Sequence, residues 1–201
     1  MGENEIKIGT QTWTSKNLEV STYRNGDDIP LVEDGKKWKN LTTGAWCYYE
    51  NKTGKGSTYG KLYNSYAVND PRGLAPSGYH IPSDEEWTTL TNYLGGETIA
   101  GTKMKSSSGW GNNDNGTNTI GFAGLPGGYL NSLSGKFAAI GYYGSWWSSS
   151  EQLYTEANSP SQEAGLYKLN AWFYLLVSDR GHVYRNCNKK HIGQSVRCLR
   201  D

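Results

Sequence analysis

Apolar and polar residues alternate in short runs along much of the chain, and this pattern predicts short strands. The segment 7–14 alternates clearly and indicates an N-terminal hairpin. Further along the chain, the pair Asn25-Gly26 predicts a turn. We expect the last three predicted strands to form an antiparallel set. Aromatic and aliphatic runs place the further strands at 46–49, 122–129, 144–151, 167–176, 182–184 and 195–199.

One segment, 83–94, has the periodicity of an amphipathic helix. Trp87, Leu90 and Leu94 are spaced so that they fall on one helical face. Ser83 and Glu86 form the sequence signature of a capping box, and a Gly-Gly pair follows the last apolar residue. The acidic run 84–86 lies in the first turn, where the helix dipole favours negative charge. Helix geometry therefore explains these carboxylates better than acid–base chemistry does.

The remaining segments predict a mixed α+β fold. A weaker helix is expected over 98–105, a helical turn over 33–39, and a strand followed by a helical turn over 59–68. The chain of 201 residues shows neither a repeat nor a disordered linker, so we expect one domain, 1–201, with short helices, an antiparallel sheet and much irregular loop. Residues typical of turns predict loops over 51–57, 106–119 and 151–163.

The segment 173–188 differs from its surroundings. It mixes aromatic, aliphatic, acidic, basic and small residues, and it follows no strand or helix period over its length. Such a mixture does not predict a core, but it is suited to a recognition surface. The closing run 195–200 is typical of a buried terminal strand. We interpret the chain as a scaffold that displays a binding face.

Composition and charge exclude some classes of function. A net charge of +1 and a pI near 7.6 provide no basic surface for nucleic acid or an anionic membrane. Trp (8), Tyr (15) and Gly (26) are abundant, which is typical of loop-rich extracellular domains, and Trp and Tyr supply the rigid contact area that binding sites favour. No run approaches the roughly 20 apolar residues of a membrane span, so membrane insertion is not expected. The acidic, polar start is not a signal peptide; either export uses another route or a leader is missing.

The three cysteines leave two interpretations open. Cys47 and Cys198 lie in predicted strands, whereas Cys187 lies in the irregular segment. In the first interpretation, Cys47 and Cys198 are core neighbours joined by a disulfide and Cys187 is an exposed free thiol. In the second, all three thiols are reduced and buried. Neither CxxC nor His-x3-His spacing occurs, so no zinc site and no other cofactor is expected.

Motifs along nearly the whole chain resemble those of the Fibrobacter succinogenes major paralogous domain. The resemblance implies a C-type-lectin-like fold of the formylglycine-generating-enzyme type. The chain departs from the family pattern at Gln194, where an aromatic residue is usual, and at Ala75, where a cysteine is usual. The first departure puts the packing before the last strand in question, and the second removes a disulfide partner. In order, the motifs are 8–13 (IGTQTW), 43–48 (TGAWCY), 59–64 (YGKLYN), 76–87 (PSGYHIPSDEEW), 121–128 (GFAGLPGG), 146–151 (WWSSSE) and 193–198 (GQSVRC).

The resemblance extends to the variable proteins of diversity-generating retroelements, which keep a constant fold and vary surface residues near the C-terminus to bind different ligands. It implies a variable ligand-binding segment at 172–192 and a constant terminal strand at 193–201. Adenine-directed mutagenesis of Asn-type codons cannot produce Lys, Glu, Gln, Met or Trp, and 173–188 contains none of these five. The implied function is non-enzymatic binding of an unknown protein or glycan, at a cell surface, in the secreted space or on a virus particle. The alternative is a cell-surface or attachment module of fixed specificity with the same fold.

The residues expected to bind the ligand lie in the variable segment and just before the strand at 144–151. Alternation along the final strands would turn every second residue outward, and Tyr and Arg dominate binding hot spots. We assign Trp146, Trp147 and Trp172 to the core. The predicted ligand-binding residues are Tyr142, Tyr143, Ser145, Phe173, Tyr174, Val177, Ser178, Asp179, Arg180, His182, Tyr184, Asn186, Asn188, His191 and Ile192.

Catalysis and calcium binding are the competing chemistries. His80 has no evident partner to orient it as a base, so we expect a structural role. Formylglycine-generating enzymes hold copper with a cysteine pair, and no such pair is evident here, so we expect no enzyme activity. The oxygen-rich run 112–118 lacks the first Asp and the final Glu of an EF-hand, and Asn-Gly turn chemistry explains it.

Overall fold

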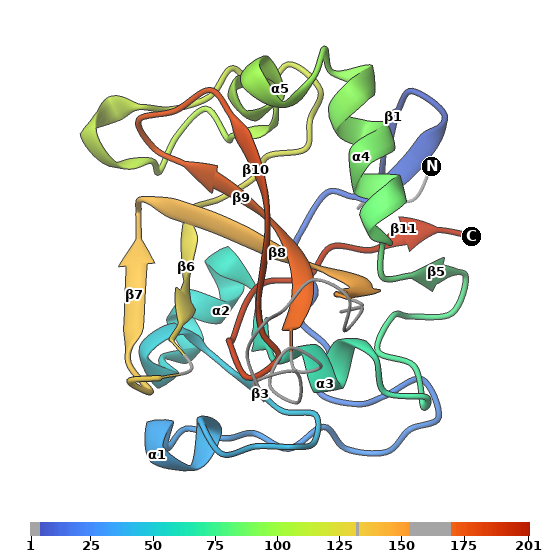
Figure 1. The fold of residues 1–201 in the computed structure, drawn as a ribbon, viewed down its shortest axis with the longest axis vertical. Helices are drawn as coiled ribbons and strands as arrows, with labels where there is room; N and C mark the ends of the chain where they lie inside the picture. Colours follow the sequence, from blue (N-terminus) through green and yellow to red (C-terminus); the bar gives the residue numbers. More distant parts are fainter. Residues whose placement is uncertain (1–4, 132, 153–169) are drawn as a thin grey trace, which may run out of the picture.

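The computed structural model describes residues 5–131, 133–152 and 170–201 (Figure 1). They form a mixed α+β structure with short helices and several antiparallel sheets. The strands are β1 (Glu5–Ile8), β2 (Gln11–Thr14), β3 (Trp46–Cys47), β4 (Leu62–Tyr63), β5 (Tyr79–His80), β6 (Gly127–Leu130), β7 (Phe137–Ile140), β8 (Tyr143–Glu151), β9 (Asn170–Val177), β10 (Val183–Lys189) and β11 (Leu199–Arg200). The helices are α1 (Gly35–Trp38), α2 (Thr53–Tyr59), α3 (Ser65–Val68), α4 (Asp84–Tyr93) and α5 (Glu97–Met104), with 3-10 turns at Tyr49–Asn51 and Gly111–Asn113.

The sheet β10-β9-β8 lies at the centre of the molecule (Figure 1). Both outer strands pair antiparallel with β9, so Trp147 of β8 and Asn186 of β10 lie opposite Phe173. Opposite residues in such pairs share a face, and neighbours along a strand point to opposite faces. Consequently Trp147 and Phe173 lie on one face, and Trp146 and Tyr174 lie on the other.

Each face of this sheet contributes to a different part of the core. On the face toward α4 and α5, Trp146 and Tyr174 pack with Trp87 of α4, and the rings of Trp87 and Tyr174 stack at 5.0 Å. On the opposite face, Trp147 and Phe173 pack with residues of β4, α3 and the segment before β11. The sheet is therefore packed on both faces around Trp146 and Trp147.

The two ends of the described chain meet in the sheet β1-β2-β11-β5. Gly9, with φ of 60°, makes the turn between β1 and β2. Strand β11 pairs with β2 through Leu199 and Trp13 and with β5 through Leu199 and His80. The N- and C-terminal ends consequently lie on the same side of the molecule (Figure 1).

Several sequence predictions are confirmed. The N-terminal hairpin forms, and α4 begins with the predicted capping box, in which Ser83 accepts from the Glu86 backbone while Glu86 accepts from the Ser83 backbone. The weaker helix, the helical turn near residue 35 and the strand-then-turn at 62–68 are present as α5, α1, β4 and α3. The predicted loop at 151–163 lies outside the described residues from 153 onward, and so does the predicted strand start at 167–169.

The strands predicted at 167–176 and 182–184 are present, from residue 170 on, as β9 and β10. Other predictions are wrong. The stretch 51–57 was expected to be a loop, but most of it lies in α2. The strand β7 was not predicted. The segment 173–188 was not expected to build core, but the inner residues of its hairpin do so. The terminal strand β11 is only Leu199–Arg200, and Ser195 makes an isolated bridge instead.

All three cysteines are free, which excludes the disulfide interpretation. Cys47 and Cys198 are buried in different apolar clusters, and Cys187 is half-buried rather than exposed. Burial raises the pKa of Cys198 to about 12 and also raises that of Cys47. Because a thiolate is the reactive form, both thiols are inert packing groups near neutral pH.

Helix α5 supports the turn between β9 and β10 at close range. A Cβ on Gly101 would meet the carbonyl oxygen of His182 at 2.4 Å and that of Gly181 at 2.7 Å. The backbone nitrogen of Thr102 also donates to the carbonyl of Gly181, and Lys105 Nζ donates to the carbonyls of Val177 and Ser178. Contacts with α5 and Lys105 therefore hold the end of β9 and the turn that follows it.

We expect Gly101→Ala to lower the free energy of unfolding by about 1–3 kcal/mol, because the new methyl group overlaps backbone oxygens that cannot move without shifting the turn. Gly54→Ala in α2 is the matched control. Nothing lies within 4 Å of a Cβ there, so alanine should stabilise by up to about 1 kcal/mol through helix propensity. Urea unfolding of both variants checks this, and equal effects would show that α5 does not clamp the turn.

Candidate ligand-binding site

Several predicted ligand-binding residues lie on one face of the central sheet. Tyr143 lies opposite Val177, and Tyr184 lies opposite Leu175. Facing residues share a side of the sheet, so the register gathers one set of side chains. We call this set the hairpin face: Tyr143, Ser145, Phe173, Leu175, Val177, Tyr184, Asn186 and Asn188.

A pocket of about 190 Å³ opens on the hairpin face. Its walls come from the rings of Tyr129 and Tyr143, which stack at 6.3 Å, and from the apolar side chains of β9. Ser145 and Gln194 are nearly fully buried residues in its lining. We call it the ring pocket; it is lined by Tyr129, Asn131, Tyr143, Ser145, Phe173, Leu175, Asn188, Ile192 and Gln194.

A second, shallower hollow adjoins the ring pocket. Tyr143 lines both, and the second also contains Tyr142, Val177, Ser178 and Asp179. Tyr142 is 47% exposed, so it offers a large aromatic surface to solvent. The two hollows together bring most of the predicted site residues of β8, β9 and the following turn into one continuous area.

The structure divides the predicted site residues by exposure. Those that are exposed or half-buried are Tyr142, Tyr143, Val177, Asp179, Arg180, His182, Tyr184, Asn186, Asn188 and His191. The remaining five were expected at the surface and are buried, so their predicted exposure is wrong: Ser145, Phe173, Tyr174, Ser178 and Ile192. Of these five, Ser145, Phe173 and Ile192 line the ring pocket from inside.

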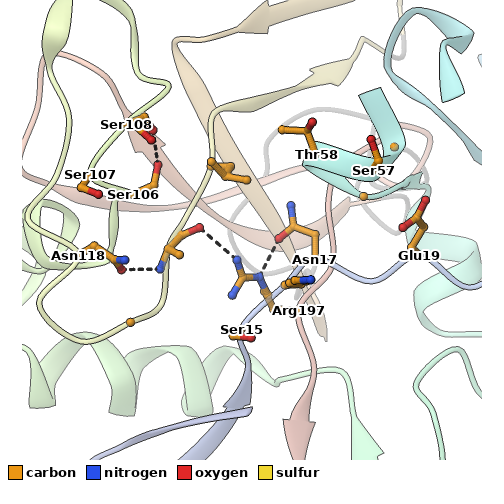
Figure 2. Close-up of a pocket in the computed structure, with 16 residues that line it drawn as sticks. Ser15, Asn17, Glu19, Ser57, Thr58, Ser106, Ser107, Ser108, Asn118 and Arg197 are labelled. Atoms are coloured by element: carbon orange, nitrogen blue, oxygen red, sulfur yellow. Dashed lines mark hydrogen bonds between the residues drawn. The ribbon is translucent and has the colours of Figure 1, made fainter. Parts of the chain in front are cut away.

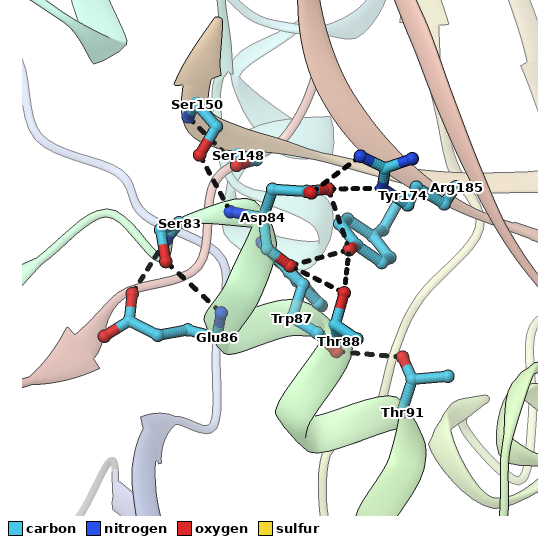
Figure 3. Close-up of polar contacts among 10 residues, drawn as sticks. All are labelled: Ser83, Asp84, Glu86, Trp87, Thr88, Thr91, Ser148, Ser150, Tyr174 and Arg185. Atoms are coloured by element: carbon cyan, nitrogen blue, oxygen red, sulfur yellow. Dashed lines mark hydrogen bonds and ion pairs between the residues drawn. The ribbon is translucent and has the colours of Figure 1, made fainter.

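Tyr174 has a structural role on the opposite face (Figure 3). Its hydroxyl donates to the backbone and side-chain oxygens of Asp84, at 2.9 and 3.0 Å, and lies 3.1 Å from Thr88 Oγ1. Burial of the Tyr174 side chain is the main reason that its pKa is raised. Arg185 of β10 makes two hydrogen bonds of 2.7 Å to the Asp84 carboxylate. Asp84 therefore does more than stabilise the start of α4, because it fastens the hairpin to that helix.

Trp172 was assigned to the core, but it is half-buried. The Arg185 guanidinium lies 3.5 Å from the centre of its ring, a cation–π contact at the surface of the hairpin. His182 and Tyr184 form another exposed pair, with rings stacked at 5.6 Å. Aromatic surface is thus available on both sides of β10.

A wider cleft, of about 490 Å³, lies elsewhere (Figure 2). The side chains lining it are mostly hydroxyls and amides, with Arg197 among them, and none is a predicted site residue. Many of its polar atoms already hold the fold together. Asn17 Oδ1 accepts from Arg197 and Trp146, Asn118 Oδ1 accepts from the Ala123 backbone, and Ser106 Oγ accepts from Trp110. We therefore assign this cleft to the scaffold.

His80 has two orienting partners that the sequence did not reveal, so the expectation that it lacks one is wrong. Its two ring nitrogens lie 2.8 Å from Asp201 Oδ1 and 2.9 Å from Glu86 Oε1. Burial alone would lower the pKa of His80, but these two carboxylates outweigh it and the pKa is raised. Within 5–131, 133–152 and 170–201, no group of three or more His, Cys, Asp or Glu side chains is arranged to hold a metal ion. Asn112, Asn113 and Asn118 adopt positive φ, which agrees with turn chemistry in that loop.

Sequence reasoning missed four residues of the ring pocket: Tyr129, Asn131, Leu175 and Gln194. Leu175 could have been found by continuing the alternation from Phe173 to Val177. Tyr129 lies in β6 and Asn131 follows it, and no local sequence pattern predicts that these residues lie beside the hairpin.

Among the described helices, none is both long and apolar enough to cross a membrane. No curated protein and no solved structure matches the chain. The profile of the Fibrobacter succinogenes major domain matches residues 6–200, which is nearly the whole chain. The chain therefore belongs to the Fibrobacter succinogenes major domain family.

Proposed function

We propose that this chain is a non-enzymatic ligand-binding protein with a C-type-lectin-like scaffold, and that the hairpin face with its adjoining turn carries the ligand. The observation that supports this most is the separation of roles within 170–189. Tyr174 and Phe173 are buried and fix the hairpin, while Asn186, Asp179 and His182 are exposed, and Asp179 lines the second hollow. Exposed residues can change without loss of the fold, whereas the buried ones cannot.

We further propose that the face is diversified, as in the variable protein of a diversity-generating retroelement. The residue types of 173–188 agree with adenine-directed mutagenesis, and the exposed ones fall on a hairpin that α4 and α5 hold in place. The test is to sequence the DNA flanking the gene. A near-repeat of the region coding for 172–201 that differs at adenines, next to a reverse transcriptase gene, is the expected result. Absence of both would leave the alternative, a surface or attachment module whose binding face does not vary.

We expect simultaneous replacement of the exposed residues Asp179, Arg180, His182 and Asn186 by serine to leave the thermal midpoint nearly unchanged. Surface substitutions of this kind shift stability by no more than about 0.5 kcal/mol each, and the Asp179–Arg180 ion pair is exposed and weak. Phe173 is excluded from the set because it is buried.

The same variant should lose the ligands that the wild-type protein captures on protein and glycan arrays. The matched control is Ser107→Ala together with Ser108→Ala at the large cleft, which should keep those ligands. A variant that unfolds several degrees earlier would show that the turn belongs to the scaffold. A stable variant with unchanged ligands would place binding elsewhere.

A further inference from the structure

We propose that His80 is a pH-sensitive switch, which holds Asp201 beside strand β5 while its ring is protonated and releases Asp201 when the ring loses that proton. The ring lies between two carboxylates that come from different elements. Its Nδ1 is 2.8 Å from Oδ1 of Asp201, the residue after β11, and its Nε2 is 2.9 Å from Glu86 Oε1 in α4. An ionised carboxylate is only an acceptor, so both contacts are hydrogen bonds only when both ring nitrogens carry a proton.

A neutral ring can satisfy only one of these carboxylates. It has a single N–H, and the lone pair of its other nitrogen would face a negatively charged oxygen. Burial lowers the pKa of His80, but the hydrogen bonds to the two carboxylates outweigh burial and raise it above its usual value of about 6.5. The two contacts are therefore complete below about pH 6.5, and one of them is lost as the pH rises through the raised pKa.

The contact with Asp201 is the one that is lost. Glu86 is held a second time, because its Oε2 accepts from the backbone nitrogen of Ser83 at 2.8 Å in the capping box (Figure 3). The side chain of Asp201 is 57% exposed, against 33% for Glu86, and in the described part of the chain its carboxylate bonds to His80 alone. A neutral His80 therefore donates to Glu86 and no longer binds Asp201.

The other charged groups around His80 have partners of their own. Arg200 of β11 lies 3.5 Å from the carboxylate of Glu5 in β1, and the hydroxyl of Tyr79 donates to the same carboxylate. Arg24, which lines the hollow beside His80, donates to the carbonyl of Tyr79 at 2.7 Å. These contacts do not depend on the His80 proton and keep β5 in place, so the release is confined to the residue after β11.

The experiment follows the histidine rings by NMR between about pH 5.5 and pH 9, on either side of the usual histidine pKa. His191 is the comparison within the same chain, because burial and the nearby Lys189 lower its pKa. We expect His80 to titrate above about pH 6.5 and His191 below it. At the acidic end, the His80 ring protons should show NOEs to side-chain protons of both Asp201 and Glu86. As His80 loses its proton, the NOEs to Asp201 should disappear and those to Glu86 should remain.

Three results would each overturn the inference. The first is titration of His80 below about pH 6.5. The second is persistence of both sets of NOEs at every pH. The third is loss of the NOEs to Glu86 in place of those to Asp201.

Two variants at exposed positions, which should both fold, test the cause of the release. Asp201→Asn introduces an amide, which can donate to the lone pair of a neutral His80 while the ring donates to Glu86. Its NOEs to residue 201 should persist at alkaline pH, and the pKa of His80 should fall. The control, Glu85→Gln, removes an exposed carboxylate next to Glu86 in the first turn of α4 and should behave as the wild-type protein does. Release in Asp201→Asn at the wild-type pH, or an equal fall of the His80 pKa in both variants, would overturn the inference.

Discussion

Replacement of Trp147 by alanine is expected to lower the free energy of unfolding by about 3–5 kcal/mol. The side chain is fully buried, its ring contacts Phe173 at 6.1 Å edge to face, and its Nε1 donates to the carbonyl of Tyr63 at 2.8 Å. Alanine would leave a large cavity beneath the inner end of the hairpin face. Urea unfolding followed by circular dichroism measures the loss.

Two controls give this result its meaning. Trp147→Phe keeps an aromatic ring but removes the Nε1 donor, so it should cost less than alanine. Tyr142→Ala removes an aromatic side chain that is 47% exposed and should cost less than about 1 kcal/mol. A similar loss for Tyr142→Ala and Trp147→Ala would contradict the division into a fixed scaffold and a face that can change.

Arg197→Met is expected to cost about 3 kcal/mol or more, although methionine removes a buried charge. Arg197 is 1% exposed, and burial lowers its pKa to about 9, so it remains protonated near neutral pH. Its guanidinium donates to the carbonyls of Thr14, Phe122 and Ala123 and to Asn17 Oδ1. Figure 2 shows the bond to Asn17. In the described part of the chain no carboxylate pairs with it. Without arginine these buried acceptors lose a donor, at about 1–3 kcal/mol for each group left unsatisfied.

The conservative variant and an exposed arginine test that explanation. Arg197→Lys keeps the charge but has a single nitrogen, which cannot reach all the acceptors of the two segments 14–17 and 122–123, so we expect a loss nearly as large. Arg180→Met, at an exposed ion pair, should shift stability by no more than about 0.5 kcal/mol. If Arg197→Met proved neutral in urea unfolding, the guanidinium would not be what joins these segments.

Local signals in the sequence predicted the elements that depend on local interactions. The start of α4 follows from the capping box of Ser83 and Glu86, whose hydrogen bonds span only three residues. Helix α2 shows the limit of this reasoning. Its two glycines lower the helix propensity, but Gly56 lies against the ring of Tyr48, where a Cβ would approach to 2.1 Å. Tertiary packing selects that glycine, and a local pattern cannot reveal it.

Where the ligand binds stays a prediction, but the sequence did not predict which residues of the hairpin strands point inward. Phe173 and Tyr174 are adjacent in sequence and lie on opposite faces, one lining the ring pocket and the other bonded to Asp84. A segment in which both faces of a strand are partly buried has no clean alternation, so the sequence cannot say which residue points where. The unpartnered side-chain nitrogen of Gln194 is visible only in the structure.

The sheet that joins β1 to β11 has a consequence for how this domain can be combined with others. Only β2 separates β1 from β11, and neighbouring strands lie about 4.8 Å apart, so these two strands run roughly 10 Å from each other. A loop of a host protein could therefore be cut open and the whole domain inserted there with little distortion of the host. The same closeness would let the original ends be linked and new ends opened elsewhere, which makes the fold a candidate for circular permutation.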